Sequence, residues 1–216
     1  MDQTNAMPID RDAFREVVRH PKAHALILGN YRLGEYAGVV ALERLLQEMR
    51  PEGKLHEAMT IHFNDEGRHS RVFTDWIERL GETPQPFPKN VEGFFANSPE
   101  EFAAQRQLVE QLPPDMRRIV VFAGINAIER LAYNQFDVHL SCLDRKEDRD
   151  VLQSVIDEEK FHLSYVENEL ERQSKGENGG FVTMCLEQAK ARFAIFQETR
   201  RAETAAALDC LLGAGA

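Results

Sequence analysis

Two short motifs of the form Glu-x-x-His each pair a carboxylate with an imidazole at helical spacing. They are Glu66 with His69 and Glu159 with His162. Residues three apart lie on one face of a helix, about a turn from each other, so both side chains of a motif can reach the same metal ion. Both motifs interrupt helix stripes that are otherwise apolar, where burying them without a cationic partner would be costly. They are therefore predicted to be metal ligands.

Two further glutamates occupy the centres of apolar helix stripes. Glu35 lies in the helix predicted from Pro21 to Met49, and Glu129 lies in the helix predicted from Asp115 to Leu143. In each case a short turn follows, and then a Glu-x-x-His helix. Glu43 is a competing candidate, but eight residues along a helix turn it about 80 degrees away from the face of Glu35. The two helix pairs therefore share one layout.

The spacing predicts that these side chains lie at one height. In an antiparallel helix pair, residues equidistant from the turn are level with each other. The midpoint of positions 35 and 66 falls at Arg50-Pro51, and the midpoint of positions 129 and 159 falls at Asp144. Four buried glutamates would repel one another unless cations join them. Carboxylate and imidazole ligands suit a pair of iron or manganese ions, with zinc as an artefact of expression.

This order of ligands, with a long connection between the two pairs, resembles the ferritin-like di-iron carboxylate superfamily. The resemblance covers about residues 21–173. It implies a four-helix bundle that holds two iron ions, or alternatively manganese or a mixed manganese and iron pair. Each histidine would bind one metal, and the glutamates that bridge the metals remain open. The implied metal ligands are Glu35, Glu66, His69, Glu129, Glu159 and His162.

The stretch Asp65-Glu66-Gly67-Arg68-His69 is similar to that of oxygen-activating members of the superfamily. The resemblance implies that the acid before each ligand glutamate holds the histidine of the other pair, which fixes the ring tautomer and raises ligand basicity. Asp65 would then orient His162, and Glu158 would orient His69. The usual acid at the second position is Asp, so Glu158 departs from the pattern.

Other polar residues close to the predicted ligands have two interpretations each. His62 could carry protons or act as a third ligand, but an ordinary hydrogen-bonded core histidine is favoured. Tyr31, Tyr133 and Asn126 could assist the centre, although packing with a bonded polar group is the simpler interpretation. The histidines off the stripes, which are not predicted to bind metal, are His20, His24, His56 and His139. The cysteines, predicted to be inert, are Cys142, Cys185 and Cys210.

The rest of the chain is expected to complete one all-α domain over residues 1–216, with the bundle at 21–173. A short helix from Asp10 to His20 precedes the bundle. The connection at 81–114 spans 34 residues, enough to cross the length of a bundle, and contains a short helix capped by Ser98. After a charged turn from Asp144 to Asp148, the fourth helix runs to about Gln173. A fifth helix at 182–212 should cover the bundle or pack against a second subunit.

Composition limits the partners. The net charge is −10 and the isoelectric point is near 5.2, which argues against nucleic acid or an anionic membrane as a partner. Three cysteines without a C-x-x-C pair indicate a reducing cytoplasm, and no signal peptide or membrane span is apparent. We expect a cytoplasmic protein, compatible with a homodimer, whose partners are a small-molecule substrate and an electron donor.

The resemblance implies two functions. The first is an oxidoreductase that activates dioxygen or peroxide at the metal pair to oxidise a small organic substrate. The second is a ferroxidase or iron-storage protein, although storage ferritins commonly lack the second Glu-x-x-His. A rubrerythrin-type peroxidase is disfavoured because no rubredoxin-like Cys pair is present, and a transfer-RNA hydroxylase because the chain is acidic. Fold alone does not select the substrate.

Overall fold

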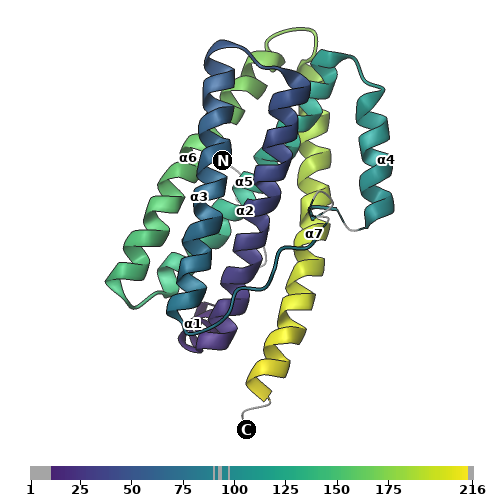
Figure 1. Ribbon diagram of the computed structural model, residues 1–216. Helices are drawn as coiled ribbons and strands as arrows, with labels where there is room; N and C mark the ends of the chain where they lie inside the picture. Colours follow the sequence, from purple (N-terminus) through teal and green to yellow (C-terminus); the bar gives the residue numbers. More distant parts are fainter. Residues whose placement is uncertain (1–10, 90, 92–93, 97, 214–216) are drawn as a thin grey trace.

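The computed structural model describes residues 11–89, 91, 94–96 and 98–213 (Figure 1). Within these residues the protein is all-helical, with seven helices and no strand. They are α1 (Arg11–Arg19), α2 (Pro21–Met49), α3 (Gly53–Arg79), α4 (Pro99–Glu110), α5 (Pro114–Cys142), α6 (Lys146–Ser174) and α7 (Gly179–Gly213). The predicted all-α class is thus confirmed. Asp10, the predicted start of the first helix, lies outside the described residues.

Two predicted helix starts need correction. The helix α6 begins at Lys146, inside the stretch predicted as a turn. Glu147 and Asp148 fall in its first turn, where negative charge is favourable beside the helix N-terminus. The helix α7 begins at Gly179 instead of Val182, because the backbone N–H of Val182 donates to the carbonyl of Asn178 at 2.9 Å and closes the first turn.

The first helix pair is defined by its ends. Pro21 starts α2, a position where the missing N–H costs nothing, and Nδ1 of His20 accepts a hydrogen bond from the N–H of Ala23 at 3.4 Å. Arg50 ends α2 in the left-handed conformation, with φ of 44°, and Pro51 follows. The chain then reverses directly into α3, which packs along α2 (Figure 1).

The second pair is formed by α5 and α6, and α6 also packs against α3. The connection from α3 runs along the outside of α2 and leads through α4, so α5 starts at the same end of the molecule as the turn between α2 and α3 (Figure 1). Ser98 caps α4 as predicted, since its Oγ accepts a hydrogen bond from the N–H of Glu101 at 3.1 Å. Both pairs therefore lie side by side with their middles close together.

The apolar core is divided into two clusters along the helix axes. The first apolar cluster includes Leu42, Met59, Phe122 and Val166. The second apolar cluster includes Leu28, Phe73, Phe136 and Leu152. Each of α2, α3, α5 and α6 contributes residues to both clusters. In each of these helices, the glutamate predicted as a ligand lies between the residues of the first cluster and those of the second. Apolar packing at both ends thus holds a polar layer in the middle.

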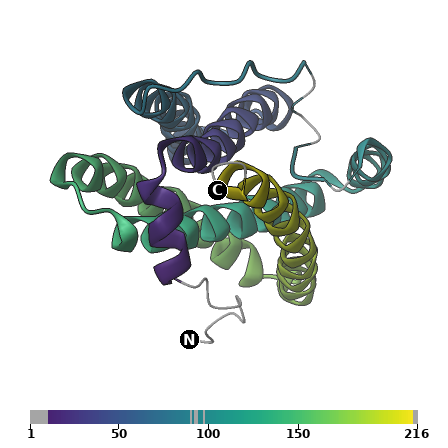
Figure 2. The ribbon, with the colours of Figure 1, turned by 90° about the horizontal axis from the view of Figure 1, so that it is seen from below.

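The last helix closes one side of the molecule. α7 packs mainly against α5 and also contacts α2 and α6 (Figure 2). Phe193 and Phe196 are buried on its inner face, where Phe95 from the connection packs against both rings. No helix in the described part of the chain combines the length and apolar character needed to cross a membrane.

Candidate metal centre

The six residues predicted as ligands meet in the polar layer between the two apolar clusters. None is more than 5% exposed, and His69 and His162 are completely buried. One acidic residue comes from each of α2, α3, α5 and α6, and the histidines come from α3 and α6. The antiparallel pairing brings them to one height along the bundle. This agrees with the sequence, in which the two glutamates of each helix pair are equally far from the turn between them.

Their donor atoms form two overlapping groups. In each group, one donor atom of every residue lies within 4.8 Å of the others. The first group is Glu35, Glu66, His69 and Glu159, and the second is His62, Glu66, Glu129 and His162. Because Glu66 belongs to both groups, its carboxylate lies between two adjacent positions that could each hold a cation.

Both predicted ligand histidines turn the same nitrogen toward the carboxylates. Nδ1 of His69 lies 3.1 Å from Oε2 of Glu35 and 3.2 Å from Oε1 of Glu159. Nδ1 of His162 lies 3.2 Å from Oε2 of Glu159 and 3.8 Å from Oε2 of Glu129. These nitrogens therefore face the interior of the two groups, where a cation would sit.

The opposite ring nitrogens face acids on the outside of the centre. Nε2 of His69 lies 2.8 Å from Oε2 of Glu158, and Nε2 of His162 lies 3.4 Å from Oδ2 of Asp65. These are the cross-pair contacts that the resemblance implies. A proton held on Nε2 by an acid leaves the Nδ1 lone pair free to bind a metal.

Arg68 connects the two outer acids. Its Nη2 donates to Glu158 and lies 3.3 Å from Oδ1 of Asp65. Sequence reasoning missed this role because it depends on a contact between α3 and α6. One guanidinium thus holds both orienting carboxylates in place.

The electrostatics of the centre reflect the burial of several ionisable groups close together. Burial raises the pKa of Glu66 well above its ordinary value, and the neighbouring carboxylates raise it further. Burial, followed by the charge of Glu129, raises the pKa of Glu159 to about 7. Burial lowers the pKa of His162, but its hydrogen bonds to Asp65 and to nearby glutamates outweigh that effect and raise it to about 11. The buried layer therefore gathers carboxylates whose mutual repulsion a divalent cation would relieve.

One buried oxygen supports the same conclusion. Oε1 of Glu159 is buried and has no hydrogen-bond partner in the described part of the chain, although it lies 3.2 Å from Nδ1 of His69. A buried carboxylate oxygen without a hydrogen bond is costly unless a cation lies beside it. The donor set of carboxylates and imidazoles therefore fits a pair of divalent metal ions.

His62 is hydrogen-bonded and buried, and its partners are the predicted ligands themselves. Its Nε2 lies 3.0 Å from Oε1 of Glu66 and 3.2 Å from Oε1 of Glu129, and its ring stacks on His162 with 3.8 Å between centroids. Nδ1 of His62 lies 2.8 Å from the hydroxyl of Tyr165. Tyr165 was not predicted, although its place one turn after His162 was a usable signal. Both interpretations of His62, core residue and third ligand, fit this geometry.

The other tyrosines and Asn126 lie in different surroundings. Tyr133 is half-buried against the second apolar cluster, and among the described residues its hydroxyl has no hydrogen bond to a predicted ligand. The ring of Tyr31 packs edge-on against Phe136, and burial raises the pKa of its hydroxyl. Oδ1 of Asn126 accepts from Nε of Arg130 at 3.2 Å. Packing therefore explains the two tyrosines.

Two histidines predicted to lie off the stripes are nevertheless buried. Their Nε2 atoms, in His24 and His139, are 3.0 Å apart. The reason is that α1 and α3 cover them, since the ring of Phe14 packs on His139 and that of Trp76 packs on His24. Within the described part of the chain, neither belongs to a group that could hold a metal ion. Cys142 and Cys185 are buried free thiols, and Cys210 is exposed.

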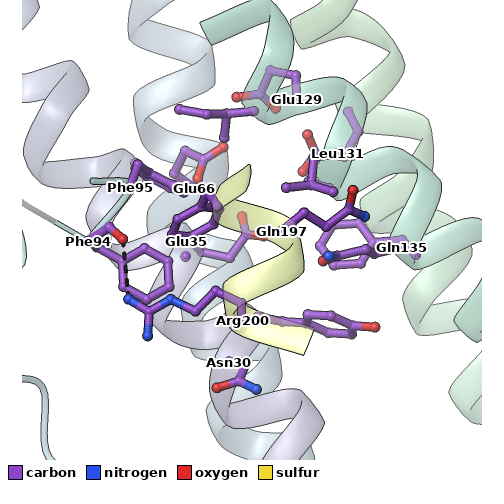
Figure 3. Close-up of a pocket in the computed structure, with 18 of the residues that line it drawn as sticks. Asn30, Glu35, Glu66, Phe94, Phe95, Glu129, Leu131, Gln135, Gln197 and Arg200 are labelled. Carbon is purple, nitrogen blue, oxygen red and sulfur yellow. Dashed lines mark hydrogen bonds between the residues drawn. The ribbon is translucent and has the colours of Figure 1, made fainter. Parts of the chain in front are cut away.

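A cavity of about 480 Å³ opens onto the carboxylates (Figure 3). Glu35, Glu66 and Glu129 line it together with mostly apolar side chains of α2, α5 and α7. Gly38 also lines it, and a Cβ at that position would lie 2.4 Å from Oε2 of Glu66. Gly38 was not predicted, and it leaves the space in which the carboxylate shared by both groups lies.

Comparisons with protein-family models, with curated protein sequences and with solved structures returned no match. The assignment of this centre therefore depends on its own geometry. That geometry establishes an all-helical protein with two overlapping, buried carboxylate and histidine groups that could hold metal ions.

Proposed function

We propose that this protein is a di-metal oxidoreductase of the ferritin-like type, most simply a di-iron enzyme, that oxidises a small organic substrate. The observation that carries the proposal is the pair of buried donor groups that share Glu66. The proposed ligands are Glu35, Glu66, His69, Glu129, Glu159 and His162, with His62 beside the second group. Manganese, or a mixed pair, would use the same donors.

When bound, two iron ions would supply the chemistry, reducing dioxygen or peroxide with electrons from an external donor and using the resulting oxidant on the substrate. The chain's own residues have other tasks. Asp65 and Glu158 hold the Nε2 protons of the ligand histidines, and Arg68 holds both acids. Tyr165 and His62 form a hydrogen-bonded pair beside Glu66 that could relay a proton at Nε2 of His62.

The cavity favours this function over iron storage. Its apolar lining reaches the carboxylates from α2, α5 and α7. Such a lining excludes water and suits an organic molecule, and about 480 Å³ lies within the range of ordinary small-molecule sites. A route for hydrated iron ions would instead be lined with polar groups, since apolar walls cannot replace a hydration shell.

The test is to load the protein with ferrous iron without oxygen and then expose it to oxygen while the charge-transfer absorption is recorded. If the protein is an oxidoreductase, the band decays and reforms only when a reductant and an organic substrate are present. Steady accumulation of ferric iron without reductant, in a large hollow assembly seen by size-exclusion chromatography, would instead identify a storage protein.

A further inference from the structure

The cavity is elongated along α2. Its lining residues on that helix run from Ile27 to Leu45 and recur on one face, with Glu35 near the middle. At 1.5 Å per residue, this face extends for about 27 Å. A compact ring would fill only part of such a space, whereas an unbranched chain can lie along the helix. The shape therefore favours an extended ligand.

Most of the lining is apolar on both sides of the carboxylates. Leu42 and Ile125 lie toward the first apolar cluster, and Phe136 belongs to the second. Phe94 and Phe196 contribute from the connection and from α7. Burial of a hydrocarbon chain here would stabilise the complex, because each methylene group would leave water for an apolar surrounding.

One charged residue in this lining has no partner among the residues that the structure describes. Arg201 is half-buried and lines the cavity, yet within the described residues it forms no ion pair or hydrogen bond. Its neighbour Arg200 differs, because Nη1 of Arg200 lies 2.9 Å from Oε2 of Glu203 and Nη2 donates to the carbonyl of Phe94 at 3.5 Å (Figure 3). A guanidinium left unpaired in an apolar cavity is suited to bind an anion, and it binds a carboxylate best through two parallel hydrogen bonds.

Two amides lie in the same lining. Gln135 from α5 and Gln197 from α7 are half-buried, and neither makes a hydrogen bond within the described part of the chain (Figure 3). A third amide in the lining, Asn30, differs from them because its Nδ2 donates to Oγ1 of Thr204 at 3.2 Å. Among the described residues of this lining, Arg201 and these two side-chain amides therefore remain able to bind a ligand.

We propose that the cavity binds an amphipathic monocarboxylate, whose carboxylate lies against Arg201 and whose apolar chain lies along α2 beside the glutamate centre. The role of this ligand as the compound that is oxidised rests on the proposed function. Its binding does not, because Arg201 and the apolar lining belong to the chain itself.

The experiment is isothermal titration of the metal-free, full-length protein with decanoate, with decanol and with decylammonium, each below its micellar concentration. Metal is removed so that the ligand carboxylate can only meet protein groups, which separates this test from that of the metal centre. In the wild type, decanoate should bind at least about tenfold more tightly than decanol, as expected for a charge-assisted pair, and decylammonium should bind most weakly.

The variants locate the effect. Arg201→Gln should remove the preference for decanoate over decanol, while Lys190→Gln, which removes a charge from an exposed position on the same helix, should keep it. Circular dichroism confirms that each variant is folded. Equal binding of decanoate and decanol by the wild type, binding of neither, or an unchanged preference in Arg201→Gln would each overturn the proposal.

Discussion

At the scale of single residues, the centre depends on how close Glu66 lies to its neighbours. Gly38 gives it room, since a Cβ there would lie 2.4 Å from Oε2 of Glu66. Gly38→Ala should therefore displace the carboxylate shared by both donor groups while leaving the fold intact, because the end of a glutamate side chain can move. We expect the bound metal to fall to about one ion per chain or less, measured by elemental analysis after desalting.

The control is Gly29→Ala on the same helix, where an added Cβ would meet nothing within 4 Å. In both variants, replacing glycine by alanine stabilises the helix itself by roughly 1 kcal/mol, so this effect cancels in the comparison. A Gly38→Ala protein that keeps the metal content of Gly29→Ala would show that Glu66 does not bind metal where it lies in this structure.

The acids outside the centre make a second prediction at this scale. Asp65→Asn and Glu158→Gln remove the charges that face Nε2 of His162 and His69. The histidines then lose basicity and their fixed tautomer, so metal affinity should fall by about 10- to 100-fold. Competition with a metal chelator measures this loss. Asp157→Asn, an exposed neighbour on α6, should leave the affinity unchanged, and equal affinities in all variants would contradict the orienting role.

At the scale of helices, the polar contact between His24 and His139 links α2 to α5. Burial lowers the pKa of His24 to about 4, and burial together with the proximity of His24 lowers that of His139. In the unfolded chain both titrate near 6.5, so the unfolded state binds more protons between these values. The stability conferred by this pair is therefore complete above about pH 6.5 and is lost as the pH falls toward 4.

The corresponding variant is His24→Leu with His139→Leu. It should lose the part of the pH dependence that comes from this pair. Between pH 7 and pH 4 this is about 3 kcal/mol from His24 alone, and His139 adds to it. Denaturant unfolding at several pH values measures it. His56→Leu, at an exposed site on α3, is the control and should keep the wild-type slope. A double variant with an unchanged slope would mean that the pair does not titrate as its burial implies.

Helices and ligand candidates could be predicted from sequence because their signals are local. Glu35 and Glu129 interrupt apolar stripes, and Pro21 and Ser98 mark helix starts. The roles of Gly38 and Arg68 could not be predicted, because each depends on a contact or a space between helices. Tyr165 left only one local signal, its place one turn after His162. The burial of His24 and His139 was also missed, since it depends on how α1 packs across the end of α2 and α5.

At the scale of the whole molecule, α2, α3, α5 and α6 each place a glutamate in one buried layer, which a bound cation would stabilise. A ligand that binds only the folded state stabilises it, by about 2.7 kcal/mol at a concentration 100 times its Kd. For a chain of 216 residues this should raise the melting temperature by roughly 5–10 °C. Calorimetry with and without ferrous or zinc ions measures the shift. Glu66→Gln should largely lose it, and an equal shift in that variant would place the stabilising metal elsewhere.

The most direct measurement is the number of metal ions that each chain holds after anaerobic loading with ferrous iron and desalting. The account predicts two ions per chain for the wild type, fewer than one for Glu66→Gln, and two for Glu43→Gln, whose side chain is exposed on α2. A wild-type protein that retains no iron, or a Glu66→Gln protein that retains two ions, would contradict the claim that this buried layer is a di-metal centre.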